Sequence, residues 1–494
     1  MVKYILLILS AALCGLSFNQ PDFSFLIWFS LTPFFYCLRS GKLRQVLKYG
    51  FVFSFLFYAI SMFWLNHVTI LGFFALLLYF SFLFLGYAAA ARYFIIRPFR
   101  IFTLSFLWLV FEYLRENIWP DCGWANLAYS QFRNLGLIQA ADIFGAKFIS
   151  FLIVMVNIFW LDVFYYFRKT PGIRIKKIQI LRNSIFIFLV ILLCFGYSLY
   201  RLKTCRPSSS IEVTLIQPAI PEEAKYDFTS SPGVVRSLIY LGKKSKPKSL
   251  VIFPEAAWPF VVSEENIEDL QSLAKTTSNP CLIGAVRLKD KKFFNSALYF
   301  DVDGRLIGAY DKIRLVPYGE YVPLRRYLRF ISVINKLGDM SAGRRPVRFS
   351  FDSKFFTVLI CFEDVFSDLV RDFARESDFL INITNDAWFY GEPQSSQHLA
   401  IMTFRAVENR ISIIRSANTG ISGWVSFMGQ PQAIKRQDKE VFFEAADYFT
   451  VVLNDQRSFY NKFGEWFVVL AEFMLIFFWL ITRKKEEVHY EDRA

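Results

Sequence analysis

The stretch "FFTVLICFEDVF", residues 355–366, places a cysteine where an apolar run meets two carboxylates. The run ends at Cys361, and Glu363 and Asp364 follow almost at once. The thiolate is the nucleophilic form of cysteine, whereas an apolar setting and nearby negative charge both favour the neutral thiol. Cys361 is therefore either a buried structural thiol or a nucleophile that a positive charge elsewhere in the chain activates.

Two other segments carry groups that would complement a nucleophilic thiol. "VIFPEAAW" presents Glu255 after an apolar run, and "YDKIRLVPYGEYVP" carries Lys312 and Glu320. Acyl transfer through a thioester requires a thiol that attacks and a carboxylate that removes and returns protons. It also requires a cation that stabilises the thiolate and the tetrahedral oxyanion. Lys312 would then supply the positive charge that Cys361 lacks.

The elements that must position these residues are short strands and helices between about residues 201 and 464. The β-like runs are 211–217, 249–255, 281–288, 295–301, 355–361, 378–384 and 411–418. Helix-like stretches at 263–277 and 396–410 separate some of them, and "DVDGRL" (301–306) is typical of a hairpin turn. Strands that alternate with helices predict an α/β domain with a covered sheet, and polar residues at strand ends predict the place of the chemistry.

The rest of the chain is too apolar for an ordinary soluble protein. Hydrophobic residues make up 54% of its 494 residues, and 58 of them are Phe. We expect eight membrane spans, the first being a retained helix instead of a cleaved signal peptide. The apolar runs lie at about 4–18, 23–38, 49–65, 71–91, 101–118, 144–167, 184–200 and 465–482. The charged residues of "VFEYLRENIW" in the fifth run are costly in a membrane unless they lie near its surface or a cavity.

Lys and Arg cluster on one side of this predicted topology. Basic segments follow the second, fourth, sixth and last spans, and the intervening short loops carry almost no Lys or Arg. The positive-inside rule then places both termini in the cytoplasm and the α/β domain on the outer side of the membrane. We expect a transmembrane domain at 1–204, an extracytoplasmic domain at 205–460, and a final span with a cytoplasmic tail at 461–494. The net charge of +14 is explained by membrane orientation and does not indicate nucleic-acid binding.

Cofactor and metal sites are not indicated. The chain has three His and seven Cys without a CxxC pair or regular spacing, and it has no phosphate-binding glycine loop. We therefore expect no metal, no cofactor and no nucleic-acid partner. Pairing of Cys205 with Cys281 stays open at this stage.

The motifs resemble those of the nitrilase (carbon–nitrogen hydrolase) superfamily and, within it, the apolipoprotein N-acyltransferase family. They are "GWANLAYSQFRNLGLIQAADIFG", "LIQPAIPEEAKYD", "FPEAAWP", "YDKIRLVPYGEYVP", "ICFED", "ITNDAWF" and "RAVENRISIIRSANTGISG", in that order. The resemblance implies an α-β-β-α sandwich with a Glu–Lys–Cys triad. It assigns Glu255 as general base and acid, Lys312 as oxyanion stabiliser and Cys361 as nucleophile.

The resemblance also implies residues that support the triad. Glu320 would orient Lys312, while Phe362 and Glu363 beside the nucleophile would shape the site. Three residues are candidate substrate contacts: Tyr226, Asn385 and Trp388. The sequence departs from the family at two of these positions, because the family commonly has Trp at 226 and often Tyr at 362.

The implied reaction takes an acyl chain from a membrane phospholipid, with phosphatidylethanolamine as the expected donor. It passes the chain through a cysteine thioester to the α-amino group of the N-terminal S-diacylglyceryl cysteine of an apolipoprotein. The implied partners are this acceptor and the lipid bilayer, and a monomer suffices. The alternatives left open are a membrane-anchored amide hydrolase with the same triad and a transporter or scaffold with an inactive outer domain.

Overall fold

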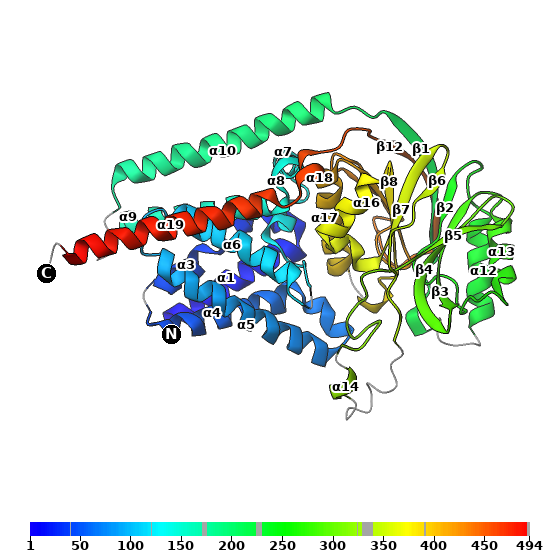
Figure 1. The fold of residues 1–494 in the computed structure, drawn as a ribbon, viewed down its shortest axis with the longest axis horizontal. Coiled ribbons are helices and arrows are strands. Elements are labelled where there is room, and N and C mark those ends of the chain that lie inside the picture. Colours follow the sequence, from blue (N-terminus) through cyan, green and yellow to red (C-terminus); the bar gives the residue numbers. More distant parts are fainter. Residues whose placement is uncertain are drawn as a thin grey trace. The chain divides into compact units, whose positions relative to one another are not determined.

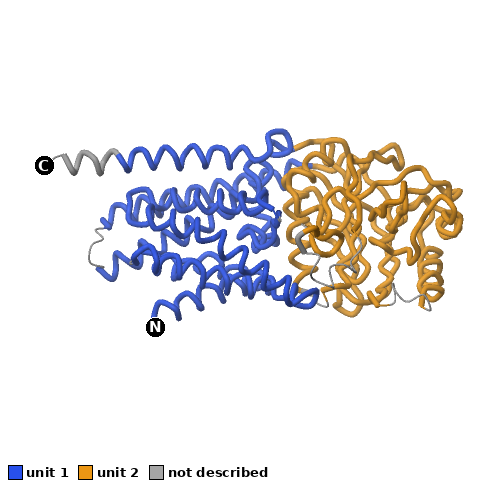
Figure 2. The backbone as a smooth tube through the Cα atoms, turned by 60° about the horizontal axis from the view of Figure 1, so that its bottom comes forward, with its two compact units in different colours: residues 1–205, 458–494 blue, residues 206–457 orange. Residues whose placement is uncertain are grey.

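The chain folds into two compact units. The computed structural model describes residues 1–39, 41–119, 121–169, 175–223, 230–323, 325–328, 339–389 and 392–491. One unit combines residues 1–205 with 458–494, and the other comprises residues 206–457 (Figure 2). Tyr226, a candidate substrate contact, lies outside the described residues. Cys281 is a free, buried thiol, so the disulfide with Cys205 that the sequence left open is not formed.

The first unit is entirely helical (Figure 1). In its described part, six helices are long and apolar enough to cross a membrane, which identifies a multi-pass membrane protein. They are α1 (Val2–Asn19), α4 (Leu43–Ser61), α5 (Ile70–Phe94), α9 (Ala146–Arg168), α10 (Lys177–Thr204) and α19 (Trp466–Glu491). Shorter elements connect them: η2 (Phe63–His67), η3 (Leu127–Gln131), α7 (Leu135–Ile138), α8 (Ala141–Phe144) and α18 (Phe459–Phe463).

The second expected span is a broken helix. The segment forms η1 (Pro21–Leu26), α2 (Ile27–Ser30) and α3 (Thr32–Arg39). The side chain of Asn157 on α9 fills the break: its Oδ1 accepts hydrogen bonds from the backbone N–H groups of Leu31 (2.8 Å) and Thr32 (3.1 Å). Its Nδ2 donates to the Ile27 carbonyl (2.9 Å). Residues 23–38 therefore form a broken helix instead of one continuous helix, because a buried amide satisfies backbone groups that a regular helix would pair internally.

The fifth expected span, α6 (Arg100–Asn117), is a continuous helix but carries too many charges to be among the six. Its charged residues are buried and partnered. Glu116 contacts Lys147 of α9 at 2.6 Å, and Lys147 also contacts Glu465 at 2.8 Å. Arg115 donates to the carbonyl of Trp124. The charged residues that would be costly in a membrane are thus paired with partners inside the unit. The number of spans, eight, stays a prediction.

Replacing Asn157 with Leu should lower the stability of the first unit. The two side chains differ little in size, but Leu leaves two N–H groups and one carbonyl of the helix break without the partner they have now, at a cost of roughly 1–3 kcal/mol each. We expect a fall of several degrees in the unfolding temperature of the detergent-solubilised protein. Ser105→Ala is the control, since this hydroxyl donates only to Ile101 within its own helix. Equal unfolding temperatures for the two variants would contradict the assigned role of Asn157.

The second unit contains two six-stranded sheets. The first has the order β12-β1-β2-β3-β4-β5 and the second the order β11-β10-β9-β8-β7-β6. The first sheet comprises β1 (Ser209–Gln217), β2 (Leu250–Ile252), β3 (Cys281–Lys289), β4 (Lys292–Phe300), β5 (Leu306–Asp311) and β12 (Ala445–Leu453). The second comprises β6 (Phe349–Phe351), β7 (Lys354–Ile360), β8 (Phe379–Thr384), β9 (Ser412–Ala417), β10 (Gly423–Val425) and β11 (Pro431–Ala433).

The two sheets pack face to face, with helices on both outer faces (Figure 1). One core lies between the sheets and joins residues such as Val213 and Ile252 of the first sheet to Val358 and Ile413 of the second. On the outer face of the first sheet pack α12 (Ser231–Gly242) and α13 (Ile267–Thr276); on that of the second pack α16 (Ser367–Arg375) and α17 (Glu392–Asn409). A four-residue helix, α14 (Arg325–Leu328), lies in the loop after β5. The expected covered α/β domain is confirmed as an α-β-β-α sandwich.

Candidate active site

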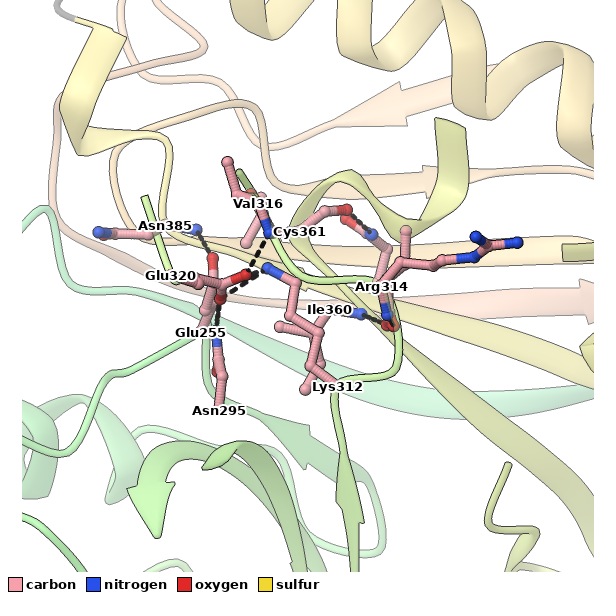
Figure 3. A network of polar contacts seen from close by, with 12 residues as sticks. Glu255, Asn295, Lys312, Arg314, Val316, Glu320, Ile360, Cys361 and Asn385 are labelled. Carbon is pink, nitrogen blue, oxygen red and sulfur yellow. Dashed lines mark hydrogen bonds and ion pairs between the residues drawn. The ribbon is translucent and has the colours of Figure 1, made fainter. Parts of the chain in front are cut away.

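The four residues expected to carry the chemistry sit at or just beyond strand ends (Figure 3). Glu255 follows β2, Lys312 follows β5 directly with Glu320 in the next loop, and Cys361 follows β7. The first three come from one sheet and Cys361 from the other. Packing of the two sheets face to face therefore brings together residues that are far apart in the sequence.

Lys312 lies between two carboxylates. Its Nζ is 2.9 Å from Oε1 of Glu320 and 3.5 Å from Oε1 of Glu255, and only 1% of its side chain is exposed. Burial by itself favours a neutral amine, but the charges of Glu320 and Glu255 outweigh it and raise the pKa of Lys312. The side chain is therefore a buried ammonium.

The two carboxylates are held by donors from several directions. The Nδ2 of Asn295 on β4 lies 2.7 Å from Oε1 of Glu255 and 2.7 Å from Oε1 of Glu320. The Asn385 backbone N–H donates to Oε2 of Glu255 (2.9 Å), and the Val316 N–H donates to Oε2 of Glu320 (2.8 Å). These donors fix the positions of both carboxylates around the Lys312 ammonium.

Asn295 was missed by the sequence analysis, which treated "NSALYFD" only as a strand. The available signal was weak: an amide at the start of an otherwise apolar run that proves to be buried. Its importance comes from its two carboxylate partners, which lie 40 and 25 residues away in the chain.

Cys361 begins a tight turn at the end of β7. Its φ is +55°, in the left-handed region that non-glycine residues rarely adopt, and the 3₁₀ turn η4 (Cys361–Val365) starts at this residue. The turn directs the chain abruptly away from the strand, and the Nδ2 of Asn382 holds the Cys361 carbonyl at 2.8 Å. Backbone strain of this kind is found where a side chain must be held in one place.

The Cys361 thiol is neutral in this environment. Burial has the largest effect and raises its pKa well above the usual range, and the negative charges of Glu255 and Asp386 add to it. The charge of Lys312 and a hydrogen bond from Thr384 act in the opposite direction but do not prevail. Lys312 thus supplies the expected positive charge, yet not enough to hold a permanent thiolate, so the proton has to leave as the sulfur attacks. Of the nearby carboxylates, Glu255 has the largest effect on the pKa of the thiol.

Glu363 connects the nucleophile's turn to the segment after Lys312. Its Oε1 accepts the N–H groups of Ile313 (2.8 Å) and Arg314 (3.0 Å), its Oε2 accepts that of Ile360 (2.8 Å), and Tyr310 donates from 2.9 Å. Burial raises the pKa of Glu363 to about 7, against the lowering effect of these backbone donors and of Lys312. This carboxyl group thereby fixes the segment that follows Lys312 relative to the turn that carries Cys361.

The remaining expected residues have different surroundings. The Phe362 ring has its centroid 5.3 Å from Nζ of Lys312. Asn385 is buried and donates from Nδ2 to Glu222 at 2.6 Å, while its backbone N–H holds Glu255. Trp388 is 44% exposed. No group of three or more His, Cys, Asp or Glu that could hold a metal occurs among the residues with described positions.

Comparison with known proteins gives the family. Residues 10–159 match the family described as "Apolipoprotein N-acyltransferase N-terminal domain", and residues 212–441 match "Carbon-nitrogen hydrolase". The apolipoprotein N-acyltransferase of Geobacter metallireducens is 31% identical over 490 residues, which cover 94% of this chain and 92% of that relative. This chain belongs to the apolipoprotein N-acyltransferase family.

A second relative agrees with membership of this N-acyltransferase family, and the resemblance drawn from the motifs is confirmed. The apolipoprotein N-acyltransferase of Thermotoga maritima is 28% identical over 514 residues, covering 99% of this chain and 95% of the relative. Among solved structures, an amidase from Nesterenkonia sp. is 18% identical with a TM-score of 0.39, covering 50% of this chain and 93% of the amidase.

Titration of Glu363 should appear in the pH dependence of stability. Its folded-state pKa of about 7 lies above the ordinary value of 4.5, so the folded protein binds the extra proton between these pH values. Its stabilising contribution is therefore complete below about pH 4.5 and is lost as the pH rises through about 7. We expect the unfolding temperature of the wild type, minus that of Glu363→Gln, to be larger at pH 5 than at pH 8. Glu268→Gln, at an exposed position, is the control; a difference that stays constant with pH would refute the raised pKa.

Loss of the Asn295 amide should slow turnover without weakening substrate binding. Asn295→Leu removes the donor shared by Glu255 and Glu320, and a hydrogen bond to a charged group is worth roughly 1.5–3 kcal/mol. We expect kcat for acyl transfer to fall about 10- to 100-fold with little change in KM. Asn279→Leu is the matched control, because this buried amide donates to the Ser245 hydroxyl and to the Thr277 carbonyl instead of to the two carboxylates. An unchanged kcat for Asn295→Leu would show that Asn295 has no role in the reaction.

Proposed function

We propose that this protein moves an acyl chain from a membrane phospholipid to the α-amino group of the N-terminal S-diacylglyceryl cysteine of apolipoproteins. The observation that carries this proposal is the ammonium of Lys312, buried between Glu255 and Glu320 and acting on the thiol of Cys361. The same chain is 31% identical to a named apolipoprotein N-acyltransferase over nearly its whole length. The product is a mature, triacylated lipoprotein.

In the first half-reaction, Cys361 attacks an ester carbonyl of the phospholipid. Glu255 takes the thiol proton as the carbon–sulfur bond forms, which suits a thiol that is neutral at rest. The carbonyl oxygen becomes negative, and Lys312 with the backbone N–H of Phe362 stabilises it. The ester C–O bond then breaks, Glu255 returns the proton to the departing lysophospholipid, and an acyl thioester remains on Cys361.

In the second half-reaction, the lipoprotein amine attacks the thioester. An α-amino group has an ordinary pKa of about 8, so a substantial part is protonated at neutral pH and a base is needed. Glu255 takes the amine proton, the amide bond forms, and the sulfur leaves and regains a proton from Glu255. One carboxylate therefore serves both halves of a ping-pong reaction.

Other residues of the site would act by position. Glu320 keeps Lys312 charged and oriented, and Glu363 fixes the turn that carries Cys361 and Phe362. Trp388, which is partly exposed, is suited to contact an acyl chain or the acceptor lipid. We assign Asn385 and Tyr226 to substrate contact on the resemblance of their motifs alone.

The apolar helices support a lipid donor in preference to a small soluble amide. Six helices suited to the membrane place the chain where phospholipids are abundant, and a hydrolase of small amides has no need of them. We propose phosphatidylethanolamine as the donor, acting through its sn-1 chain, and a monomer as the working unit. From the Lys and Arg distribution we propose eight spans, cytoplasmic termini, and residues 206–457 on the outer side of the inner membrane.

Labelled phospholipid can test the proposal. Detergent-purified protein is incubated with phosphatidylethanolamine labelled in the sn-1 chain, with and without a diacylated lipopeptide that has a free N-terminus. We expect label to stay on the protein until the lipopeptide is added and then to appear on its amine. Cys361→Ala should abolish both signals, whereas Cys281→Ala, which removes another buried thiol, should retain them.

Two results would contradict the acyltransferase. Release of the label as free fatty acid without the lipopeptide would indicate a hydrolase, in which water resolves the thioester. Undiminished transfer by Cys361→Ala would indicate that the sandwich unit is not the catalytic part of the chain.

A further inference from the structure

Thr384 lies beside the nucleophile on the neighbouring strand. β7 and β8 are parallel, and their register pairs Ile360 with Ile383. The next residues, Cys361 and Thr384, therefore leave the two strand ends side by side. Thr384 is fully buried, and its hydroxyl is near enough to the Cys361 side chain to lower the pKa of the thiol. The register of the two strands therefore places a hydroxyl group next to the reacting sulfur.

The Thr384 hydroxyl has a second acceptor. It donates to Oδ1 of Asp386 at 2.9 Å. A threonine hydroxyl carries a single proton, so it can donate fully to Asp386 or to the sulfur, but not to both. A neutral thiol is a weak acceptor, whereas a thiolate is a strong one. The preferred acceptor should therefore change when the sulfur becomes charged.

The Asp386 carboxylate can lose the hydrogen bond from Thr384 because another group, Arg415, also stabilises its negative charge. The Nη2 of Arg415 lies 2.8 Å from Oδ2 of Asp386, and both side chains are about 1% exposed or less. The same Nη2 lies 2.6 Å from Nδ1 of His398, whose Nε2 is 2.7 Å from Oδ1 of Asp364. Because a guanidinium only donates, Nδ1 is the acceptor and Nε2–H donates to Asp364. Asp364 belongs to the turn that Cys361 begins, so the network closes on the nucleophile's own turn.

This network also accounts for two residues that the triad leaves without a role. His398 lies on α17, and Asp364 is one of the two carboxylates in the turn after Cys361. Both are buried and connected through Arg415 to Asp386. Gly420 packs so closely that a Cβ there would come within 2.2 Å of Oδ2 of Asp386, so the carboxylate has little room to move.

We propose that Thr384 is a further catalytic residue, whose hydroxyl hydrogen bonds to Asp386 in the resting enzyme and turns to the Cys361 sulfur while that sulfur is charged. Asp386, Arg415, His398 and Asp364 are positioning residues that hold the hydroxyl ready. The inference rests on the proposed function in that the charged sulfur arises in acyl transfer, once on attack and once when the thioester breaks.

The proton balance of this step is simple. The thiol proton passes to Glu255 when the carbon–sulfur bond forms, and Glu255 gives it to the departing lysophospholipid. When the sulfur later leaves the acyl group, it regains a proton that Glu255 has taken from the attacking amine. The Thr384 O–H bond stays intact throughout and only its acceptor changes. The hydroxyl therefore lowers the energy of both charged-sulfur states without consuming a proton.

Alkylation of Cys361 tests this inference without any lipid substrate. The full-length, detergent-purified protein is treated with iodoacetamide across a pH series, and modification of the peptide containing Cys361 is followed by mass spectrometry. Thr384→Val keeps the shape and removes the donor, so we expect alkylation at neutral pH to slow roughly tenfold and its midpoint to move to higher pH. Thr384→Ser keeps a hydroxyl and should restore the wild-type profile. Thr403→Val is the control, since this hydroxyl donates to Leu399 within α17.

Asp386→Asn provides the opposite perturbation. It removes a negative charge near the sulfur and weakens the competing acceptor, so the alkylation midpoint should move to lower pH. Opposite shifts for Thr384→Val and Asp386→Asn support the switch, whereas wild-type profiles in both overturn it. If Thr384 had a purely structural role, Thr384→Val would lower the amount of folded protein. The folded fraction would then keep the wild-type midpoint of the pH dependence of Cys361 alkylation.

The outcome is separable from that of the proposed function. Opposite midpoint shifts in a protein that transfers no label to lipopeptide would leave the hydroxyl's role intact and refute the acyltransferase. Normal transfer by Thr384→Val, together with an unshifted midpoint, would refute the hydroxyl's role and leave the acyltransferase intact.

Discussion

The active site depends on one buried ammonium. Lys312 is removed from water almost completely, and the cost of burying an isolated charge is several kcal/mol. Two carboxylates, Glu255 and Glu320, offset this cost, because an oxygen of each lies within 3.5 Å of the Lys312 Nζ. Asn295 completes the arrangement by donating to both. Each of these groups is stable in its place only because the others are present, so the cluster forms as a unit.

The same constraint determines the state of the thiol. The sulfur of Cys361 responds to this cluster, and burial together with the charge of Glu255 raises the pKa of the thiol more than the charge of Lys312 lowers it. A neutral resting thiol follows, and with it the need for a base that accepts the proton during attack. A neutral thiol is also less exposed to side reactions such as oxidation, which require the thiolate. In the proposed reaction the thiol must wait for two bulky lipids in turn, so this would be a chemical advantage.

The sequence predicted those parts of the fold and site that are encoded locally. The strands around 211–217, 355–361 and 378–384 are continuous apolar runs, and the triad residues follow such runs at once, so both were predictable. β12 was missed because it is partly exposed and shows no continuous apolar run. It is a strand because it pairs with β1, which lies more than 200 residues earlier. The break in the second apolar run was missed because Asn157, over 120 residues away, satisfies its backbone. Asn295 and Thr384 were missed for the same reason, since their roles exist only through distant partners.

The central claim is that the sulfur of Cys361, with the ammonium of Lys312 beside it, carries the acyl chain between donor and acceptor. The most direct measurement is the mass of the peptide containing Cys361 after incubation with phosphatidylethanolamine alone. A mass increase of one acyl group on Cys361, reversed by hydroxylamine and absent in Lys312→Met, is the predicted result. An unmodified Cys361 while label accumulates on another residue, or a full adduct in Lys312→Met, would contradict the account.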